Sequence, residues 1–314
     1  MDAFLNGYAW EVKLIEWFQS NLGGFGITLA KIFTQFGSEI VVVGILVVCY
    51  LCINKKLGEK IITTVIMSLA FGSIFKNLLL RMRPYFSHSS IKCLSPVDSK
   101  ADIYDISAQG YSFPSLHSAN SVSAFSSPYA FTKKKALLPL AIIAPLLVGI
   151  SRFVLGCHYP TDVMFGWLQG IVLIIIVDLS FRKLKKSTRY IVLGLLAMTG
   201  CFICKSNDYY SALGLILGFF SGNLYEERHS NFTDTDSILS KILRVAGAGV
   251  IFFVMDLLLK LPFSNEFLAS ATTAQYIFRT LRYAVIIFVI VGIYPRVFKY
   301  YDSIKLDKEK AHRD

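Results

Sequence analysis

Residues 136–177 read ALLPLAIIAPLLVGISRFVLGCHYPTDVMFGWLQGIVLIIIV, two apolar runs separated by a short polar segment. The runs cover residues 136–155 and 163–177, and a helix that crosses a bilayer needs about 20 mainly apolar residues, some of which its flanks can supply. The segment between them carries Arg152, His158 and Asp162. This stretch therefore predicts two membrane-spanning helices with chemically active side chains at the turn that joins them.

The composition extends this interpretation to the whole chain. Of 314 residues, 54% are hydrophobic and 17% charged, whereas soluble domains have about 25% charged residues. Six further apolar runs cover residues 40–53, 61–80, 190–204, 209–224, 245–259 and 283–297. A ninth segment, 117–131, is rich in Ser and Ala, which suits a helix packed inside a bundle. The sequence predicts an all-α polytopic membrane bundle of about nine transmembrane helices.

The net charge of +11 does not indicate a nucleic-acid partner, because the basic residues lie between apolar runs. They follow the first, third and fifth spans: Lys55, Lys56 and Lys60; Lys133, Lys134 and Lys135; and Arg182, Lys183, Lys185, Lys186 and Arg189. Cytoplasmic loops collect Lys and Arg, so we expect these three loops inside and the intervening loops outside. The acidic loop at 226–236, which should also be cytoplasmic, fits this rule less well.

Two more polar clusters lie at outer ends of predicted spans: KNLLLRMRP at residues 76–84 and PSLH at 114–117. With residues 151–162 they supply three cations, a hydroxyl, two imidazoles and a carboxylate: Lys76, Arg83, Arg152, Ser115, His117, His158 and Asp162. Phosphoryl transfer needs positive groups around the phosphate oxygens, a nucleophile, and an acid for the leaving oxygen. The three clusters together indicate this chemistry.

Local spacing predicts how these groups lie. Lys76 and Arg83 are seven residues apart, about two helical turns, so we expect them on one helix face with Pro84 ending the helix. Ser115 should open the next helix, either as a phosphate-binding terminus or as a simple cap. Pro160 should occupy the first turn of the following helix. His158 would then precede this helix, close enough for Asp162 to accept a hydrogen bond from its ring.

The order and spacing of the clusters resemble the type 2 phosphatidic acid phosphatase (PAP2) superfamily, whose pattern is K-x6-RP, PSGH and SR-x5-H-x3-D. The resemblance covers about residues 36–181 and departs from the pattern at Leu116, where the family usually has glycine. Glycine allows close backbone approach to a phosphate, so we expect the leucine to narrow the pocket or alter the loop.

The resemblance implies a role for each residue. His158 would attack phosphorus to form a phosphohistidine, Asp162 would orient it, and His117 would protonate the leaving group and then activate water. The phosphate-binding residues would be Lys76, Arg83, Ser115, Leu116 and Arg152. No metal or other cofactor is expected.

These features favour a phosphatase of lipid phosphates or lipid pyrophosphates, with phosphatidate, phosphatidylglycerol phosphate and polyprenyl diphosphate as candidates. A sugar-phosphate phosphatase of the glucose-6-phosphatase type is the alternative within the family, and a non-enzymatic anion or lipid transporter or binding protein is the alternative outside it. The expected location is the bacterial cytoplasmic membrane, with the site facing outward among membrane lipids. The oligomeric state is left open.

We expect four regions: an N-terminal interfacial segment (1–37), a catalytic transmembrane core (38–187), C-terminal transmembrane helices of unknown role (188–299), and a charged cytoplasmic tail (300–314). In the first region Trp10, Leu14, Trp17 and Phe18 form a stripe, with Glu11, Lys13 and Glu16 off it, which indicates a helix on the membrane surface or a packed helix. Asp256 is an intramembrane charge that is either functional or paired with Lys260. A disulfide between Cys93 and Cys157 is left open.

Overall fold

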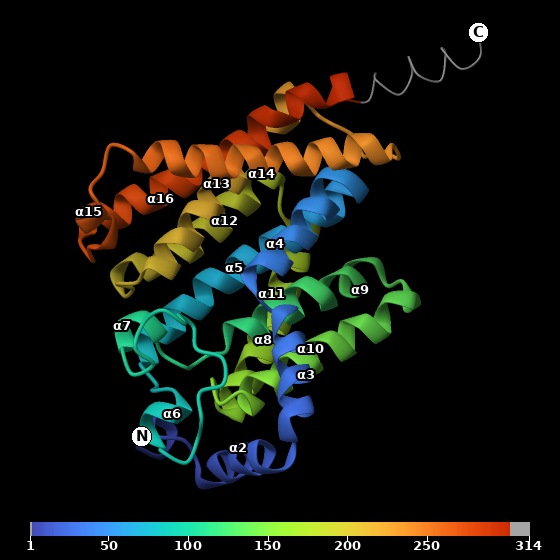
Figure 1. Ribbon diagram of the computed structural model, residues 1–314. Helices are drawn as coiled ribbons and strands as arrows, with labels where there is room; N and C mark the ends of the chain where they lie inside the picture. Colours follow the sequence, from blue (N-terminus) through green and yellow to red (C-terminus); the bar gives the residue numbers. More distant parts are fainter. Residues whose placement is uncertain (1, 302–314) are drawn as a thin grey trace. The chain divides into compact units, whose positions relative to one another are not determined.

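The computed structural model describes residues 2–301, and the elements in this part of the chain are all helical, as predicted (Figure 1). The helices that hold the candidate site and its surroundings are α1 (Asp2–Leu5), α2 (Ala9–Asn21), α3 (Gly23–Gln35), α4 (Glu39–Val48), η1 (Cys49–Ile53), α5 (Lys55–Leu79), α6 (Pro84–Ser87), α7 (Ile106–Gln109), α8 (Leu116–Ser121), η2 (Val122–Ser126), α9 (Ser127–Thr132), η3 (Lys135–Leu137), α10 (Leu138–Val154) and α11 (Pro160–Lys183). Those that follow are α12 (Lys186–Met198), η4 (Thr199–Phe202), α13 (Asn207–His229), α14 (Ile238–Lys260), α15 (Asn265–Ala269), α16 (Thr273–Phe288), η5 (Val289–Ile293) and η6 (Tyr294–Val297).

The chain folds into two compact units. The first consists of the residues up to Val43, Phe71–Leu179 and Phe202–Cys204, and the second of Gly44–Ala70, Ser180–Cys201 and the residues from Lys205 onward. Every site residue that the sequence predicts lies in the first unit.

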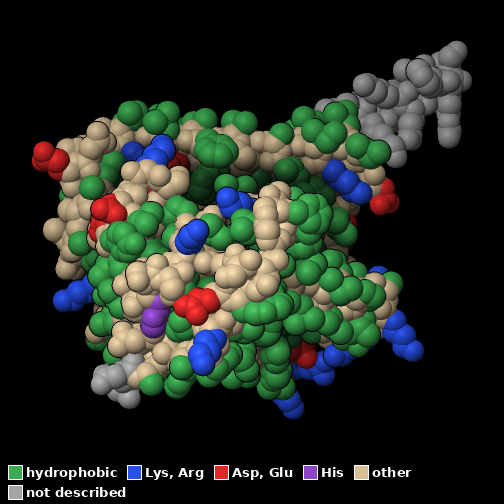
Figure 2. Space-filling view, turned by 60° about the horizontal axis from the view of Figure 1, so that its bottom comes forward, with side chains coloured by type: hydrophobic (Ala, Val, Ile, Leu, Met, Phe, Trp, Pro, Cys, Tyr) green, Lys and Arg blue, Asp and Glu red, His purple; other side chains and the backbone are tan. Residues whose placement is uncertain are grey.

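Several helices are long and apolar enough to cross a membrane. Within the described residues there are five such helical segments, or six if the bent pair Gly23–Gln35 and Glu39–Ile53 is one span. The five are Lys55–Ser87, Lys135–Val154, Pro160–Lys183, Ile238–Lys260 and Thr273–Tyr301. In Figure 2, hydrophobic side chains form much of the face in view, with charged side chains scattered among them. The chain is an integral membrane protein, and the total of about nine spans stays a prediction.

The small-residue segment predicted at 117–131 is helical. The elements α8, η2 and α9 follow one another without a break from Leu116 to Thr132, and Ser118, Ala119 and Ser121 are buried. Helix α11 approaches this segment through two glycines: a Cβ on Gly166 would lie 2.6 Å from the carbonyl oxygen of Ser115, and one on Gly170 would meet Val122. Small residues on both helices let the two backbones meet closely.

The helix at the N-terminus differs from the prediction in one important residue. Trp10 and Trp17 on α2 are exposed, whereas Phe18 packs against Phe153, so whether α2 lies on the membrane surface stays a prediction. Glu11, however, was expected on the polar side and is instead completely buried beside Ile15. The prediction for Glu11 was wrong because Arg81 supplies a buried positive charge opposite it.

Helix α3 runs alongside α10, and the turn after α3 reaches the site (Figure 1). A Cβ on Gly37 would lie 2.9 Å from the carbonyl oxygen of His117. Only glycine therefore fits here without moving the backbone that carries His117.

In the second unit, α13 packs against α16 through a row of glycines. A Cβ on Gly214 or Gly218 would lie 2.5 Å from a carbonyl oxygen of α16. Asp256 on α14 accepts a hydrogen bond from Lys260 at 2.5 Å and lies 3.3 Å from Arg282. Of the two interpretations of Asp256, the paired one is what the structure shows.

Two other predictions concern the cysteines and the tail. All six cysteines are free thiols, so Cys93 and Cys157 form no disulfide here. Residues 302–314, most of the predicted cytoplasmic tail, lie outside the described residues.

Candidate active site

The turn between α10 and α11 carries part of the polar cluster at residues 151–162. Helix α10 ends at Val154, and Gly156 turns the chain with φ +73°, close against the carbonyl oxygen of Lys92. A side chain at Gly156 would be strained in this conformation and would also meet that oxygen. Pro160 then begins α11, as predicted. The turn leaves His158 buried just before the helix, with 2% of its surface exposed.

Asp162 lies on one side of the His158 ring. Its Oδ2 is 3.6 Å from Nδ1 of His158, which is longer than a hydrogen bond, and it accepts a hydrogen bond from the backbone N–H of Tyr159 at 2.8 Å. Nδ1 has no hydrogen-bond partner among the described residues. The carboxylate therefore faces the expected nitrogen, but at an ion-pair distance rather than in the predicted hydrogen bond.

Arg83 lies on the other side of the ring. Its Nη1 is 3.5 Å from Nε2 of His158 and donates to the carbonyl of Cys157 at 3.0 Å, while its Nε donates to the carbonyls of Gln109 and Gly110. Burial, reinforced by the charges of Arg83 and Arg152, lowers the pKa of His158 well below the ordinary histidine value. The site thus disfavours the protonated form of His158, and Nε2 is the ring nitrogen that Asp162 does not face.

Lys76 and Arg83 do not share a helix face, so this part of the prediction was wrong. Helix α5 ends at Leu79, Leu80 adopts φ +50°, and Pro84 begins α6 instead of ending α5. The two cations nevertheless converge, because Lys76 Nζ donates to the carbonyl of Tyr111 at 2.6 Å, next to the carbonyls that hold Arg83.

The cluster at residues 114–117 is joined to the cluster at residues 151–162 by a backbone hydrogen bond. Ser115 caps α8, is completely buried, and its N–H donates to the carbonyl of Asp162 at 3.1 Å. Its hydroxyl accepts a hydrogen bond from the hydroxyl of Ser118 at 2.9 Å. His117 follows in the first turn of α8 and is half-buried.

Leu116, at the position of the usual family glycine, packs against α5. A Cβ on Gly72 would lie 2.2 Å from Cδ2 of Leu116. The leucine side chain thus uses the space that a glycine on the neighbouring helix leaves free.

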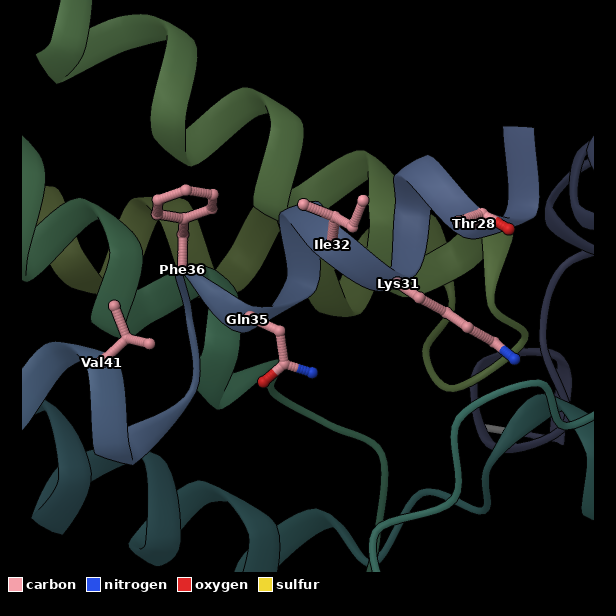
Figure 3. Close-up of a pocket in the computed structure, with 6 residues that line it drawn as sticks. All are labelled: Thr28, Lys31, Ile32, Gln35, Phe36 and Val41. Carbon is pink, nitrogen blue, oxygen red and sulfur yellow. The ribbon is translucent and has the colours of Figure 1, made fainter. Parts of the chain in front are cut away.

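Arg152 is the third predicted cation. It is 3% exposed and its Nη1 donates to the hydroxyl of Thr34 on α3 at 2.6 Å. The exposed side of α3 borders a hollow of about 340 Å³ lined by Thr28, Lys31, Ile32, Gln35, Phe36 and Val41 (Figure 3). This hollow contains none of the predicted site residues.

Sequence reasoning missed several residues that hold the site. Arg81 binds Asp162, and Glu11 binds Arg81. The side chain of Gln109 accepts from the N–H of Val97 and donates to the carbonyl of Asp98, while its own carbonyl accepts from Arg83. The doubled arginine in RMRP was a signal for Arg81, but nothing near Glu11 in the sequence indicates its partner. Across residues 2–301, no three His, Cys, Asp or Glu side chains gather as a metal site would require.

Comparison with known proteins identifies the family of the chain. Residues 59–186 match the family model described as the PAP2 superfamily, and residues 210–305 match the PAP2 superfamily phosphatase transmembrane extension. An undecaprenyl-diphosphatase of Sulfolobus acidocaldarius is 31% identical over 162 residues, which are 50% of this chain and 70% of the relative. The chain belongs to the PAP2 superfamily. It is therefore a phosphatase of this superfamily, embedded in a membrane.

A second relative, phosphatidylglycerophosphatase B of Bacillus subtilis, is 29% identical over 136 residues, which are 38% of this chain and 59% of the relative. No solved structure matches the chain. Helices α2 and α3 precede the first residue of the PAP2 match.

Proposed function

We propose that this PAP2 protein hydrolyses lipid phosphates or lipid diphosphates through a phosphohistidine on His158. The observation that carries the proposal is the position of His158, with a carboxylate toward Nδ1 and a guanidinium beside Nε2. The names of its relatives favour polyprenyl diphosphate and phosphatidylglycerol phosphate as substrates, with phosphatidate as a third candidate. A sugar phosphate is the second candidate class.

In the first step, Nε2 of His158 forms a bond to phosphorus while the bond from phosphorus to the leaving oxygen breaks. His117 donates its proton to that oxygen, which leaves as an alcohol or, from a diphosphate, as a lipid monophosphate. Arg83, Arg152 and Lys76 balance the negative charge that the phosphoryl oxygens carry in the transition state. In the second step, His117 takes a proton from water while the water oxygen bonds to phosphorus. The bond from phosphorus to Nε2 of His158 breaks, which releases inorganic phosphate and regenerates the free imidazole.

Hydrolysis by the purified protein is expected to proceed in excess EDTA and to be inhibited by vanadate. The fixed cations Lys76, Arg83 and Arg152 supply the positive charge that Mg²⁺ supplies in kinases. Vanadate adopts the five-coordinate geometry of the phosphorus transition state, so the site should bind it more tightly than phosphate. Phosphate release from lipid monophosphates, lipid diphosphates and sugar phosphates, measured with EDTA and with added Mg²⁺, tests both the mechanism and the substrate class. Strict dependence on Mg²⁺ would refute the proposal.

We further propose that the site faces the extracytoplasmic side of a cytoplasmic membrane, which would give it access to outer-leaflet lipids. Basic loops after the first, third and fifth predicted spans favour this orientation. Ser99, in the loop between α6 and α7, and Lys134, in the loop after α9, are both exposed in the structure.

In sealed right-side-out vesicles, Ser99→Cys is expected to react with a membrane-impermeant thiol reagent, whereas Lys134→Cys should react only after permeabilisation. The unsubstituted protein gives the background from its own cysteines, of which Cys201 is exposed. The reverse pattern would place the chemistry in the cytoplasm and remove outer-leaflet lipids from the candidate substrates.

A further inference from the structure

A buried ionic network lies directly behind Asp162. Arg81 Nη1 donates to Oδ1 of Asp162 at 2.5 Å, and Arg81 Nη2 donates to Oε2 of Glu11 at 2.8 Å. The side chains of all three residues have no exposed surface. The guanidinium carbon of Arg81 also lies 4.6 Å from the ring centre of Phe4 and 4.1 Å from that of Tyr159. Arg81 is therefore fixed at both ends and on its faces.

Glu11 also binds the first turn of α11, the helix that carries Asp162. Its Oε1 accepts from the backbone N–H of Thr161 at 2.9 Å and from the hydroxyl of Thr161 at 2.6 Å, and that hydroxyl accepts from Arg81 at 2.7 Å. A carboxylate at this place satisfies a helix N–H that would otherwise be unpaired and interacts favourably with the helix dipole. Glu11 thus caps α11 from a distant part of the chain.

These contacts determine how the carboxylate of Asp162 is turned. Oδ1 is occupied by Arg81, so Oδ2 is the oxygen that accepts from the N–H of Tyr159 and faces Nδ1 of His158. The carboxylate of Asp162, held in this orientation, favours the positive charge that the ring acquires as Nε2 bonds to phosphorus. Removing one member of a buried ionic group leaves an uncompensated charge, so the arrangement depends on all three residues.

We propose that Arg81 and Glu11 are positioning residues for the phosphatase reaction, acting through Asp162 on His158. Helix α2 then contributes a residue to the catalytic structure although it precedes the part of the chain that matches the PAP2 family model. The inference rests on the proposed function, in which His158 is the nucleophile that Asp162 orients. Neither residue touches the substrate, because both are completely buried behind the carboxylate.

A purely architectural role would have different consequences. If the network only holds α2 against α11, its loss should lower the unfolding temperature and the amount of folded enzyme, but not the turnover of each folded site. If it acts through Asp162, turnover should fall, and it should fall only while Asp162 is a carboxylate. A double-mutant cycle separates the two roles.

The experiment compares Arg81→Gln, Asp162→Asn and the double variant in the full-length detergent-purified protein. The concentration of folded active sites is measured by vanadate binding, and kcat is the rate divided by this concentration. Each single variant is expected to lower kcat by about 10- to 100-fold, with KM changed by less than about threefold, as for other residues that orient a reacting group. The double variant should be no slower than the slower single variant. Multiplicative losses, or an unchanged kcat in Arg81→Gln, would overturn the inference.

Two further variants keep the test decisive if Arg81→Gln does not fold. Glu11→Gln preserves shape and removes the charge, and it should lower kcat in the native background but not in the Asp162→Asn background. The matched control is Arg189→Gln, which removes a buried arginine that donates to Glu59 at 2.8 Å and lies 3.6 Å from the ring centre of Phe181. It should reduce stability and leave kcat per folded site unchanged.

The His158→Ala variant distinguishes this inference from the proposed function. If His158→Ala retains activity, the phosphohistidine mechanism fails. If His158→Ala is inactive while Arg81→Gln and Glu11→Gln turn over normally, the mechanism stands and only the positioning role is wrong.

Discussion

Replacement of His158 by alanine is expected to abolish phosphate release while the protein still folds. The imidazole is the group that forms the bond to phosphorus, and loss of a covalent nucleophile removes the main route, with a fall in kcat of about 10³-fold or more. Arg83, whose Nη1 lies 3.5 Å from Nε2, is a cation and cannot take over the role of nucleophile. Initial rates on a lipid diphosphate and a lipid monophosphate measure the effect.

The control is His229→Ala, which removes an exposed histidine in α13 that stacks on Tyr225. It should leave activity unchanged. Thermal unfolding and size-exclusion chromatography in detergent should show that His158→Ala is folded. Survival of more than a few per cent of the native rate in His158→Ala would sink the nucleophile assignment.

Much of the architecture follows from local patterns. The two apolar runs around residues 151–162 form α10 and α11, and Pro160 begins the second of these helices because its missing N–H costs nothing there. The Ser- and Ala-rich segment at 117–131 is helical and largely buried, as its small residues predict. Such features depend on residues that are close together in the sequence, so a single sequence is enough to predict them.

Other features depend on contacts between distant residues. Glu11 and Arg81 are 70 positions apart in the sequence. Exposed aromatic residues lie on both sides of Glu11 in the sequence, and this local pattern predicts an exposed glutamate on the protein surface. Only the folded chain shows that a buried arginine meets it. The same holds for Leu116, whose side chain is accommodated by Gly72 on another helix.

The break after α5 is an intermediate case. The spacing of Lys76 and Arg83 fits two helical turns, and Leu79 and Leu80 are ordinary helix formers, so propensity alone extends the helix to Pro84. In the structure Leu80 adopts a left-handed backbone conformation, and the chain from Leu80 to Arg83 is not helical. Arg83 gains four contacts in this way, to the carbonyls of Gln109, Gly110 and Cys157 and to the ring of His158. Tertiary bonds to a buried cation outweigh the modest preference for one more helical turn.

Replacement of His117 by alanine is expected to reduce activity most for substrates whose leaving group is strongly basic and needs a proton to depart. A lipid monophosphate must release an alkoxide, which needs a proton, so kcat should fall by about 10²- to 10⁴-fold. A lipid diphosphate releases a phosphate ester, and an aryl phosphate releases a stabilised phenolate, so the first step should be slowed much less for both. In the second step the variant also lacks the base that activates water.

The two roles of His117 therefore predict a specific kinetic pattern with an aryl phosphate. His117→Ala should release a rapid burst of phenol, about one equivalent per active site, because His158 is still phosphorylated but is hydrolysed slowly. Rapid-quench measurement should show an acid-labile phosphoenzyme that is absent from His117→Ala/His158→Ala. Equal losses on alkyl and aryl substrates without a burst would show that His117 neither protonates the leaving group nor activates water.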